Sequence, residues 1–260
     1  MIKLIASDLD GTLLRYGAQS LTPESLKLIS ALREHKILFV AASGRPLISQ
    51  KRLFGPIADD ISYIAENGAV YAHDGRVTVA DAIDRNLVLE IVDAVHTKPH
   101  CRMTVTSATT TYIKSGDESF LHLIRDVLRY TTVVVDDFSS ISEPIVKLAF
   151  WTPNDPSQES LYFRERFSSR IKVLTAGTAW VDFMPYGTNK GSALKALSEQ
   201  LKIAPEEILV FGDEENDVEM LDFAGTGYAM ATAKESVKAH ADYVTDKVED
   251  VLTDFLRNIP

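Results

Sequence analysis

Two acidic residues, Asp8 and Asp10, stand two positions apart at the end of a short apolar run near the N-terminus. Carboxylates that lie this close repel each other, and a cation between them would relieve the repulsion. Oxygen ligands of this kind suit Mg²⁺. One carboxylate could then serve as a nucleophile and the other as a general acid and base, although a solvated turn after a strand explains the pair about equally well.

A second and denser acidic cluster, Gly-Asp-Glu-Glu-Asn-Asp, follows the apolar run 208–211. If this run is a strand, Asp213 at its end and Asp217 one turn into the following helix can both face the first acidic pair. An acidic helix N-terminus is the competing interpretation, because the helix dipole stabilises negative charge there. That interpretation explains the two glutamates well, but Asp213 and Asn216 less well.

Two further segments could hold an anion. In Ser43-Gly44-Arg45, a hydroxyl followed by glycine can present an oxygen and a backbone N–H, although a helix cap is the simpler interpretation. Arg45 could reach a second anionic group or pair with an acid of the core. Lys190 stands in the first turn of an expected helix, where the helix dipole opposes a positive charge. A phosphate bound there would compensate, whereas a solvated lysine would need no partner.

The elements that must position these residues alternate between strand and helix at both ends of the chain. Short apolar runs predict strands at 3–7, 37–42, 63–65, 208–211 and 228–230. Leucines at helical spacing predict helices between them. Because ligands bind beyond the carboxyl ends of the strands in open α/β sheets, we expect Asp8, Ser43 and Asp213 at one edge of the sheet.

The middle of the chain has a different pattern, with helices mixed among paired strands. Such a pattern suggests an α+β unit with an antiparallel sheet. We therefore expect an α/β fold in which residues 1–81 and 186–260 form a Rossmann-like parallel-sheet core domain, with an α+β domain inserted at residues 82–185.

Length and composition, with 260 residues of which 45% are apolar and 25% charged, indicate a soluble globular protein. The 27 basic and 37 acidic residues give a net charge of −10, without the basic stripe typical of nucleic-acid binders. The apolar runs are too short to span a bilayer, and an anionic membrane surface would repel the chain. The single cysteine, Cys101, excludes a disulfide framework. A cytoplasmic protein is therefore expected, and the N-terminus predicts a strand, not a signal peptide.

The order of these motifs resembles that of the haloacid dehalogenase-like superfamily of phosphohydrolases. Asp-x-Asp-Gly-Thr at 8–12, a serine at the next strand end, a lysine, and Gly-Asp-x-x-Asn-Asp at 212–217 follow one another along the chain. The closer resemblance is to the Cof-type branch, which has a type IIB cap inserted between the second and third motifs. The resemblance covers the whole chain, and it implies a parallel-sheet core with an α+β cap.

The resemblance also implies a role for each motif residue. Asp8 would be the nucleophile that forms an aspartyl-phosphate, and Asp10 would protonate the leaving oxygen and then activate water. The implied cofactor is Mg²⁺, held by Asp8, the main-chain carbonyl of Asp10, and Asp213. The residues implied to bind the phosphate group are Ser43, Gly44, Lys190 and Asn216. Asp217 and Thr12 would support these groups.

The resemblance implies a Mg²⁺-dependent phosphatase acting on small phosphate monoesters, such as sugar phosphates or similar metabolites. A phosphomutase on the same fold and a non-catalytic regulator that binds a phosphorylated ligand are the alternatives. The regulator is disfavoured because a pure binder needs no acid–base residue such as Asp10. The expected partner is a small phosphorylated metabolite, with no nucleic acid and no membrane, and a closing cap is compatible with a monomer or a weak homo-oligomer.

Overall fold

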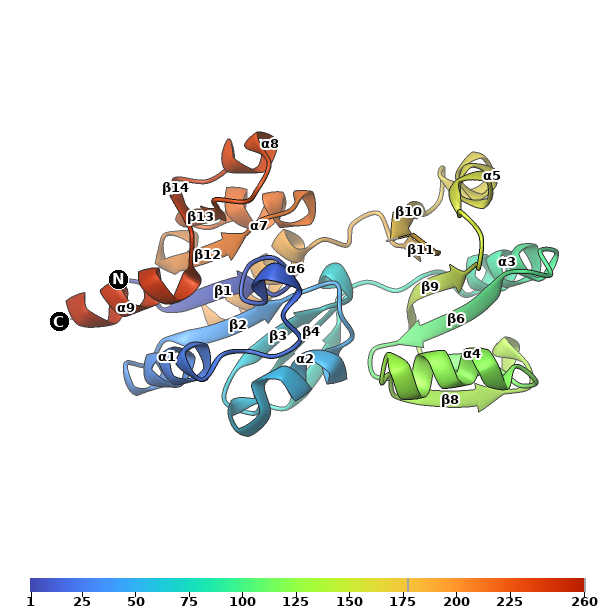
Figure 1. Ribbon diagram of the computed structural model, residues 1–260, viewed down its shortest axis with the longest axis horizontal. Helices are drawn as coiled ribbons and strands as arrows, with labels where there is room; N and C mark the ends of the chain where they lie inside the picture. The colour runs from blue at the N-terminus through green and yellow to red at the C-terminus, as the bar shows by residue number, and fades with distance from the viewer. Residues whose placement is uncertain (177, 260) are drawn as a thin grey trace. The chain divides into compact units, whose positions relative to one another are not determined.

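The computed structural model describes residues 1–176 and 178–259. The chain folds into two compact units, one formed by Met1–Ala80 with Asn189–Pro260 and the other by Asp81–Thr188. The units divide after Ala80 and after Thr188, where the sequence analysis placed the boundaries after residues 81 and 185. Each unit has its own β-sheet (Figure 1). Each also has its own apolar core.

The first unit is built on an eight-stranded sheet with the strand order β14-β13-β12-β1-β2-β3-β4-β5. Neighbours from β14 to β3 run parallel, whereas β4 is antiparallel to β3 and β5 is antiparallel to β4. The strands are β1 Leu4–Asp8, β2 Leu38–Ala42, β3 Ser62–Ala65, β4 Val70–His73, β5 Arg76–Val79, β12 Ile208–Gly212, β13 Thr226–Met230 and β14 Tyr243–Thr245. The prediction of a parallel-sheet α/β core is confirmed.

Helices cover both faces of this sheet (Figure 1). Because alternate residues of a strand point to opposite faces, Leu4 and Ala6 of β1 join the apolar cluster that contains Leu194 of α6. On the other face, Phe39 of β2 lies 6.1 Å from Phe54 of α2, measured between ring centroids. The helices are α1 Pro23–Glu34, α2 Leu47–Phe54, α6 Lys190–Leu201, α7 Val218–Phe223, α8 Glu235–Lys238 and α9 Val248–Asn258. Among the described residues, no helix is long and apolar enough to cross a membrane.

The second unit contains a six-stranded sheet with the order β10-β11-β9-β6-β7-β8. Its strands are β6 Arg102–Ser107, β7 Thr111–Lys114, β8 Thr132–Val135, β9 Ile145–Trp151, β10 Lys172–Ala176 and β11 Trp180–Met184. Its helices are α3 Arg85–His96, α4 Glu118–His122, which continues into the short π-helix Leu123–Val127, and α5 Ser157–Phe167. The expectation of an antiparallel sheet needs one correction, because β7 and β8 pair in parallel. The chain crosses between them through α4, and a crossover of this kind is what parallel pairing requires.

Aromatic side chains form much of the core of the second unit. Phe163 of α5 lies 5.1 Å from Phe150 of β9 and 5.5 Å from Phe183 of β11, measured between ring centroids. All three side chains are fully buried. Burying such large apolar groups stabilises α5 on the sheet, so this unit has a core of its own.

Candidate active site

The carboxyl edge of the first sheet brings the sequence-predicted residues together. β1 ends at Asp8, and its two neighbours in the sheet are β2 and β12. Ser43 follows the end of β2 and Asp213 follows the end of β12, so they lie on either side of Asp8 at the same edge. Lys190, the first residue of α6, also reaches this point.

A buried lysine lies between two carboxylates. Nζ of Lys190 donates to Oδ1 of Asp8 and to Oδ1 of Asp217, each at 2.6 Å, and the lysine side chain is 1% exposed. Burial by itself would lower the pKa of the Lys190 ammonium, but the two carboxylates outweigh burial and raise the pKa. Lys190 is therefore charged, and it is neither solvated nor in need of a phosphate to balance it at the helix N-terminus.

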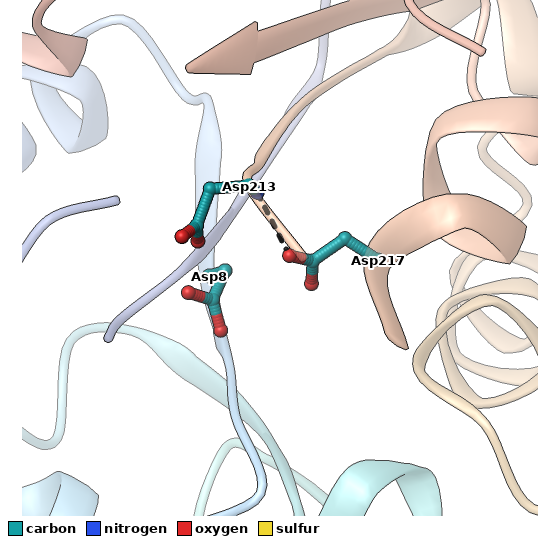
Figure 2. Close-up of side chains that lie close together, drawn as sticks. All are labelled: Asp8, Asp213 and Asp217. Carbon is teal, nitrogen blue, oxygen red and sulfur yellow. Dashed lines mark hydrogen bonds between the residues drawn. The ribbon is translucent and has the colours of Figure 1, made fainter. Parts of the chain in front are cut away.

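Both carboxylate oxygens of Asp217 are engaged by protein groups. Oδ1 accepts from Lys190. Oδ2 accepts from the backbone N–H of Asp213 at 2.9 Å (Figure 2) and from that of Glu214 at 3.1 Å. Gly212 makes room for this arrangement, since a Cβ there would lie 2.5 Å from Cβ of Asp217. Asp217 thus orients Lys190 and the loop after β12.

Three carboxylates form a cluster with the spacing of a metal site. One oxygen from each of Asp8, Asp213 and Asp217 lies within 4.8 Å of the others. Because Asp217 is engaged elsewhere, Asp8 and Asp213 are the better ligands. Oδ2 of Asp8 is buried and receives no hydrogen bond from the described residues, and burial raises the pKa of both the Asp8 and the Asp213 carboxyl groups. A hard divalent cation would occupy the unpaired oxygen and relieve the repulsion, so the donor set fits such an ion.

The loop after β1 holds the Asp213 carboxylate in place. Oγ1 of Thr12 donates to Oδ1 of Asp213 at 2.8 Å. Gly11 has a φ of +94°, and a Cβ at this position would lie 2.0 Å from Oδ2 of Asp213. Glycine is required here both for the left-handed backbone and for the close approach. Thr12 and Gly11 therefore connect the first acidic motif directly to the last.

An asparagine that the sequence analysis did not select joins two of the predicted phosphate-binding segments. Asn67 donates its backbone N–H to the carbonyl of Ser43 at 3.1 Å, and its Oδ1 accepts from Nδ2 of Asn216 at 3.0 Å. A Cβ on Gly44 would lie 3.1 Å from the Asn67 side chain. Asn67 has a φ of +52°. Its signal in the sequence was Asn-Gly directly after a strand, because asparagine tolerates this left-handed conformation.

Arg45 pairs with an acid of the core, which is one of the two alternatives that the sequence left open. Its Nε donates to Oδ2 of Asp10 at 2.8 Å, and its Nη2 donates to Oδ1 at 2.5 Å. A forked pair of this kind fixes the plane of the carboxylate. The Asp10 side chain is 54% exposed, whereas Asp8 is buried. The two acids of one motif therefore occupy different environments, as two different chemical tasks would require.

Comparison with known proteins identifies the family. The sequence profile of the haloacid dehalogenase-like hydrolases matches residues 5–253. The chain belongs to this family. The resemblance inferred from the motifs is thus confirmed, and so is the expectation of an enzyme.

Relatives of known sequence or structure extend over nearly the whole chain. YbjI of Escherichia coli K12, named a 5-amino-6-(5-phospho-D-ribitylamino)uracil phosphatase, is 25% identical over 245 residues, which are 93% of this chain and 90% of the relative. The HMP-PP phosphatase of Escherichia coli O157:H7 is 26% identical over 94% of this chain and 89% of its own. A solved structure from Eubacterium rectale has a TM-score of 0.89 and 30% identity over 98% and 99% of the two chains. The haloacid dehalogenase subclass IIB sugar phosphatase BT4131 shares the fold, with a TM-score of 0.76 and 23% identity over 97% and 98%.

Proposed function

We propose that this protein is a Mg²⁺-dependent phosphatase that hydrolyses small phosphate monoesters through an aspartyl-phosphate. One observation carries the proposal: Lys190 binds one oxygen of the buried Asp8, while the other oxygen has no donor among the described residues. Asp8 is thereby oriented by a fixed positive charge and still has an oxygen left for a ligand. The phosphatase names of the curated relatives support this class of reaction.

In this proposal Asp8 is the nucleophile. Its carboxylate oxygen forms a bond to phosphorus while the bond from phosphorus to the leaving oxygen breaks. A carboxylate that approaches a phosphate meets charge repulsion, and the buried ammonium of Lys190 lowers that repulsion because little water screens it. Bound Mg²⁺, held by Asp8, Asp213 and the main-chain carbonyl of Asp10, would supply further positive charge to the phosphoryl oxygens.

Asp10 would transfer the protons. The leaving oxygen takes a proton from the Asp10 carboxyl group, and the resulting carboxylate then accepts a proton from the water that attacks the aspartyl-phosphate. That second step releases inorganic phosphate and restores both acids. Arg45 donates to both Asp10 oxygens, so one of these hydrogen bonds would open before that oxygen carries the proton. The other would keep Asp10 in position, and Arg45 would not touch the reacting atoms.

The transferred phosphate group would be held opposite Lys190 by Ser43, Gly44 and Asn216. Asn67 supports this assignment, because its backbone binds Ser43 and its side chain binds Asn216. Groups that are linked in this way can present donors in a fixed arrangement, and such preorganisation stabilises a transition state more than flexible donors do.

We further propose that the unit Asp81–Thr188 is a type IIB cap that selects the leaving group. The names of the relatives indicate the substrate class: a phosphorylated ribityl-uracil for YbjI, HMP-PP for the second relative, and sugar phosphates for BT4131. The expected substrate is therefore a small phosphorylated metabolite of the cytoplasm, a sugar phosphate or a similar ester.

Phosphate release from a panel of small phosphate esters, with Mg²⁺ and with a chelator, tests the proposal. We expect release that depends on the metal and falls at least ~10³-fold in Asp8→Asn, while Asp59→Asn, at a carboxylate that is 92% exposed, keeps the wild-type rate. In ¹⁸O-labelled water, label should enter the released phosphate. Full activity of Asp8→Asn would overturn the nucleophile assignment. Transfer of the phosphoryl group to another position of a sugar, with no ¹⁸O from water in the product, would establish a phosphomutase instead.

A further inference from the structure

A lysine and an aspartate lie close together on the sheet of the second unit, and the proposed mechanism uses neither. Asp182 is on β11, and its direct partner on the neighbouring strand β9 is Ala149. Because alternate residues of a strand point to the same face, Lys147 of β9 shares a face with Ala149 and Asp182. Nζ of Lys147 and Oδ2 of Asp182 are 4.0 Å apart, and the two side chains are only 12% and 18% exposed. The sheet thus holds two opposite charges away from bulk water.

The two faces of this sheet differ in character. Phe150 of β9 and Phe183 of β11 belong to the apolar cluster that also contains residues of α3 and α5, so these two helices cover one face. The lysine and the aspartate alternate with these phenylalanines and therefore lie on the opposite face. On that face Trp151 and Trp180 pack against a phenylalanine of α4. The charged pair therefore stands on the polar part of a face whose other part is aromatic.

The neighbours of the pair across the sheet carry hydroxyl groups or are small. Thr106 of β6 is the register partner of Lys147, and Thr104 is the register partner of Ala149. Both threonines are buried. Hydroxyl, ammonium and carboxylate groups therefore lie beside one another on β6, β9 and β11, in an arrangement that suits a polar, uncharged ligand.

The pair is poorly suited to stabilising the fold. Removing two charges from water is costly, and only close contact with good hydrogen bonds offsets that cost. At 4.0 Å, Nζ of Lys147 and Oδ2 of Asp182 are too far apart for a direct hydrogen bond, which needs about 2.7–3.2 Å. Burial raises the pKa of the Asp182 carboxyl, and the ammonium of Lys147 offsets this only in part. A role in binding explains such a pair better than a structural role does.

The spacing of the two charged groups fits one hydroxyl group between them. A hydroxyl both accepts and donates a hydrogen bond, so it can accept from Nζ of Lys147 and donate to Oδ2 of Asp182 at the same time. Two hydrogen bonds of about 2.8 Å can span the separation of 4.0 Å. The carboxylate would repel a phosphate group at this position, so the pair favours a neutral hydroxyl over a second anion.

We propose that Lys147 and Asp182 bind a hydroxyl group of the leaving group, and that they thereby select phosphate monoesters of polyhydroxylated alcohols over aryl phosphates and bisphosphates. This inference rests on the proposed phosphatase activity and adds the two side chains that choose the ester. Neither takes part in phosphoryl transfer, so both are specificity residues. A site built to bind a hydroxyl rejects an ester that lacks it, because its buried polar groups are then left unpaired.

Ratios of kcat/KM for different esters test the proposal, because a ratio measured in one preparation does not depend on the fraction of enzyme that is folded. Asp182→Asn and Lys147→Met should each lower the ratio of the best sugar monophosphate to phenyl phosphate at least about tenfold. Glu90→Gln is the matched control, because it removes a carboxylate of the same unit that pairs with Arg170 at 2.7 Å and is 39% exposed. It should leave the ratio unchanged.

The two variants should also change the preference for a second phosphate group in opposite directions. Asp182→Asn leaves the ammonium, so fructose 1,6-bisphosphate should gain relative to the sugar monophosphate, whereas Lys147→Met leaves the carboxylate, so the bisphosphate should lose. A general disturbance of the unit would move both variants in the same direction. Unchanged ratios in both variants, or a wild-type enzyme that prefers phenyl phosphate to every sugar phosphate, would refute the proposal. Absence of phosphate release from every ester, phenyl phosphate included, would instead refute the phosphatase activity itself.

Discussion

Replacing Lys190 by methionine tests how the site is held together. Methionine keeps the length and the apolar stem of the side chain but removes its charge and its donors. Lys190 makes two hydrogen bonds of 2.6 Å to Asp8 and Asp217, whose side chains are 6% and 0% exposed. The variant therefore leaves two buried carboxylates without a counter-charge.

The size of the effect follows from that burial. Removing one partner of a buried ion pair typically costs about 3–5 kcal/mol. For a folded unit of roughly 150–250 residues, each kcal/mol lowers the Tm by about 2–4 °C, which gives a fall of about 6–20 °C. Thermal unfolding at pH 7 in a chelator measures this difference. The control is Lys195→Met, an exposed lysine on the same helix α6, for which a change within about 0.5 kcal/mol is expected.

A double variant separates charge from packing. The double variant Lys190→Met with Asp217→Asn removes one of the two buried carboxylates that lack a counter-charge, so it should recover part of the lost stability. Phosphate release should be abolished in both the single and the double variant. If the free energy of unfolding of Lys190→Met lies within about 1 kcal/mol of that of Lys195→Met, the stability of the buried carboxylates does not depend on the ammonium. The electrostatic account of the site is then wrong.

Three further predictions concern other contacts of the first unit. Gly11→Ala should raise the half-saturating Mg²⁺ concentration for activity at least tenfold, because its Cβ would lie 2.0 Å from Oδ2 of Asp213; an unchanged titration would place the metal elsewhere. Arg45→Ala should lower kcat on the order of tenfold while KM changes little. Arg45→Lys should restore little of the lost kcat, since lysine cannot make the forked pair of hydrogen bonds to Asp10. A wild-type kcat in Arg45→Ala would argue against a positioning role. Burial alone would raise the pKa of the Glu249 carboxyl, but hydrogen bonds from Ser25 and Arg15 outweigh burial and lower the pKa below 4.5. The ionised form of Glu249 therefore stabilises the fold above pH 4.5, and this contribution is lost as the pH falls further. Glu249→Gln should thus cost about 1–3 kcal/mol at pH 7 in urea unfolding, with a gap to wild type that narrows in acid; a gap independent of pH would contradict the linkage.

Much of the fold could be predicted because its signals are local. The strand predicted at 3–7 is observed at Leu4–Asp8, and the one predicted at 208–211 is observed at Ile208–Gly212. Buried parallel strands are short apolar runs, and a polar residue must follow each run where the chain leaves the sheet. For the same reason, the sequence placed Asp8, Ser43 and Asp213 at the strand ends where the structure has them.

The parallel pairing of β7 with β8 was not predictable in this way. Pattern and propensity indicate a strand at Val133–Val135, but they do not say on which side of β7 or in which direction the strand will lie. That choice depends on how α4 packs after it leaves β7, which is a property of the assembled unit.

The sequence by itself determined which residue types are available to the site and in what order, because contiguous motifs carry that information. Only the tertiary structure decided their partners. Lys190 and Asp8 are 182 positions apart, and Asn67 and Asn216 are 149 apart. No local pattern can show that a lysine which looks solvated at a helix N-terminus is buried between two aspartates. It becomes so only when β1, β12 and α6 converge at one edge of the sheet, where exclusion of water makes each charge depend on its neighbours.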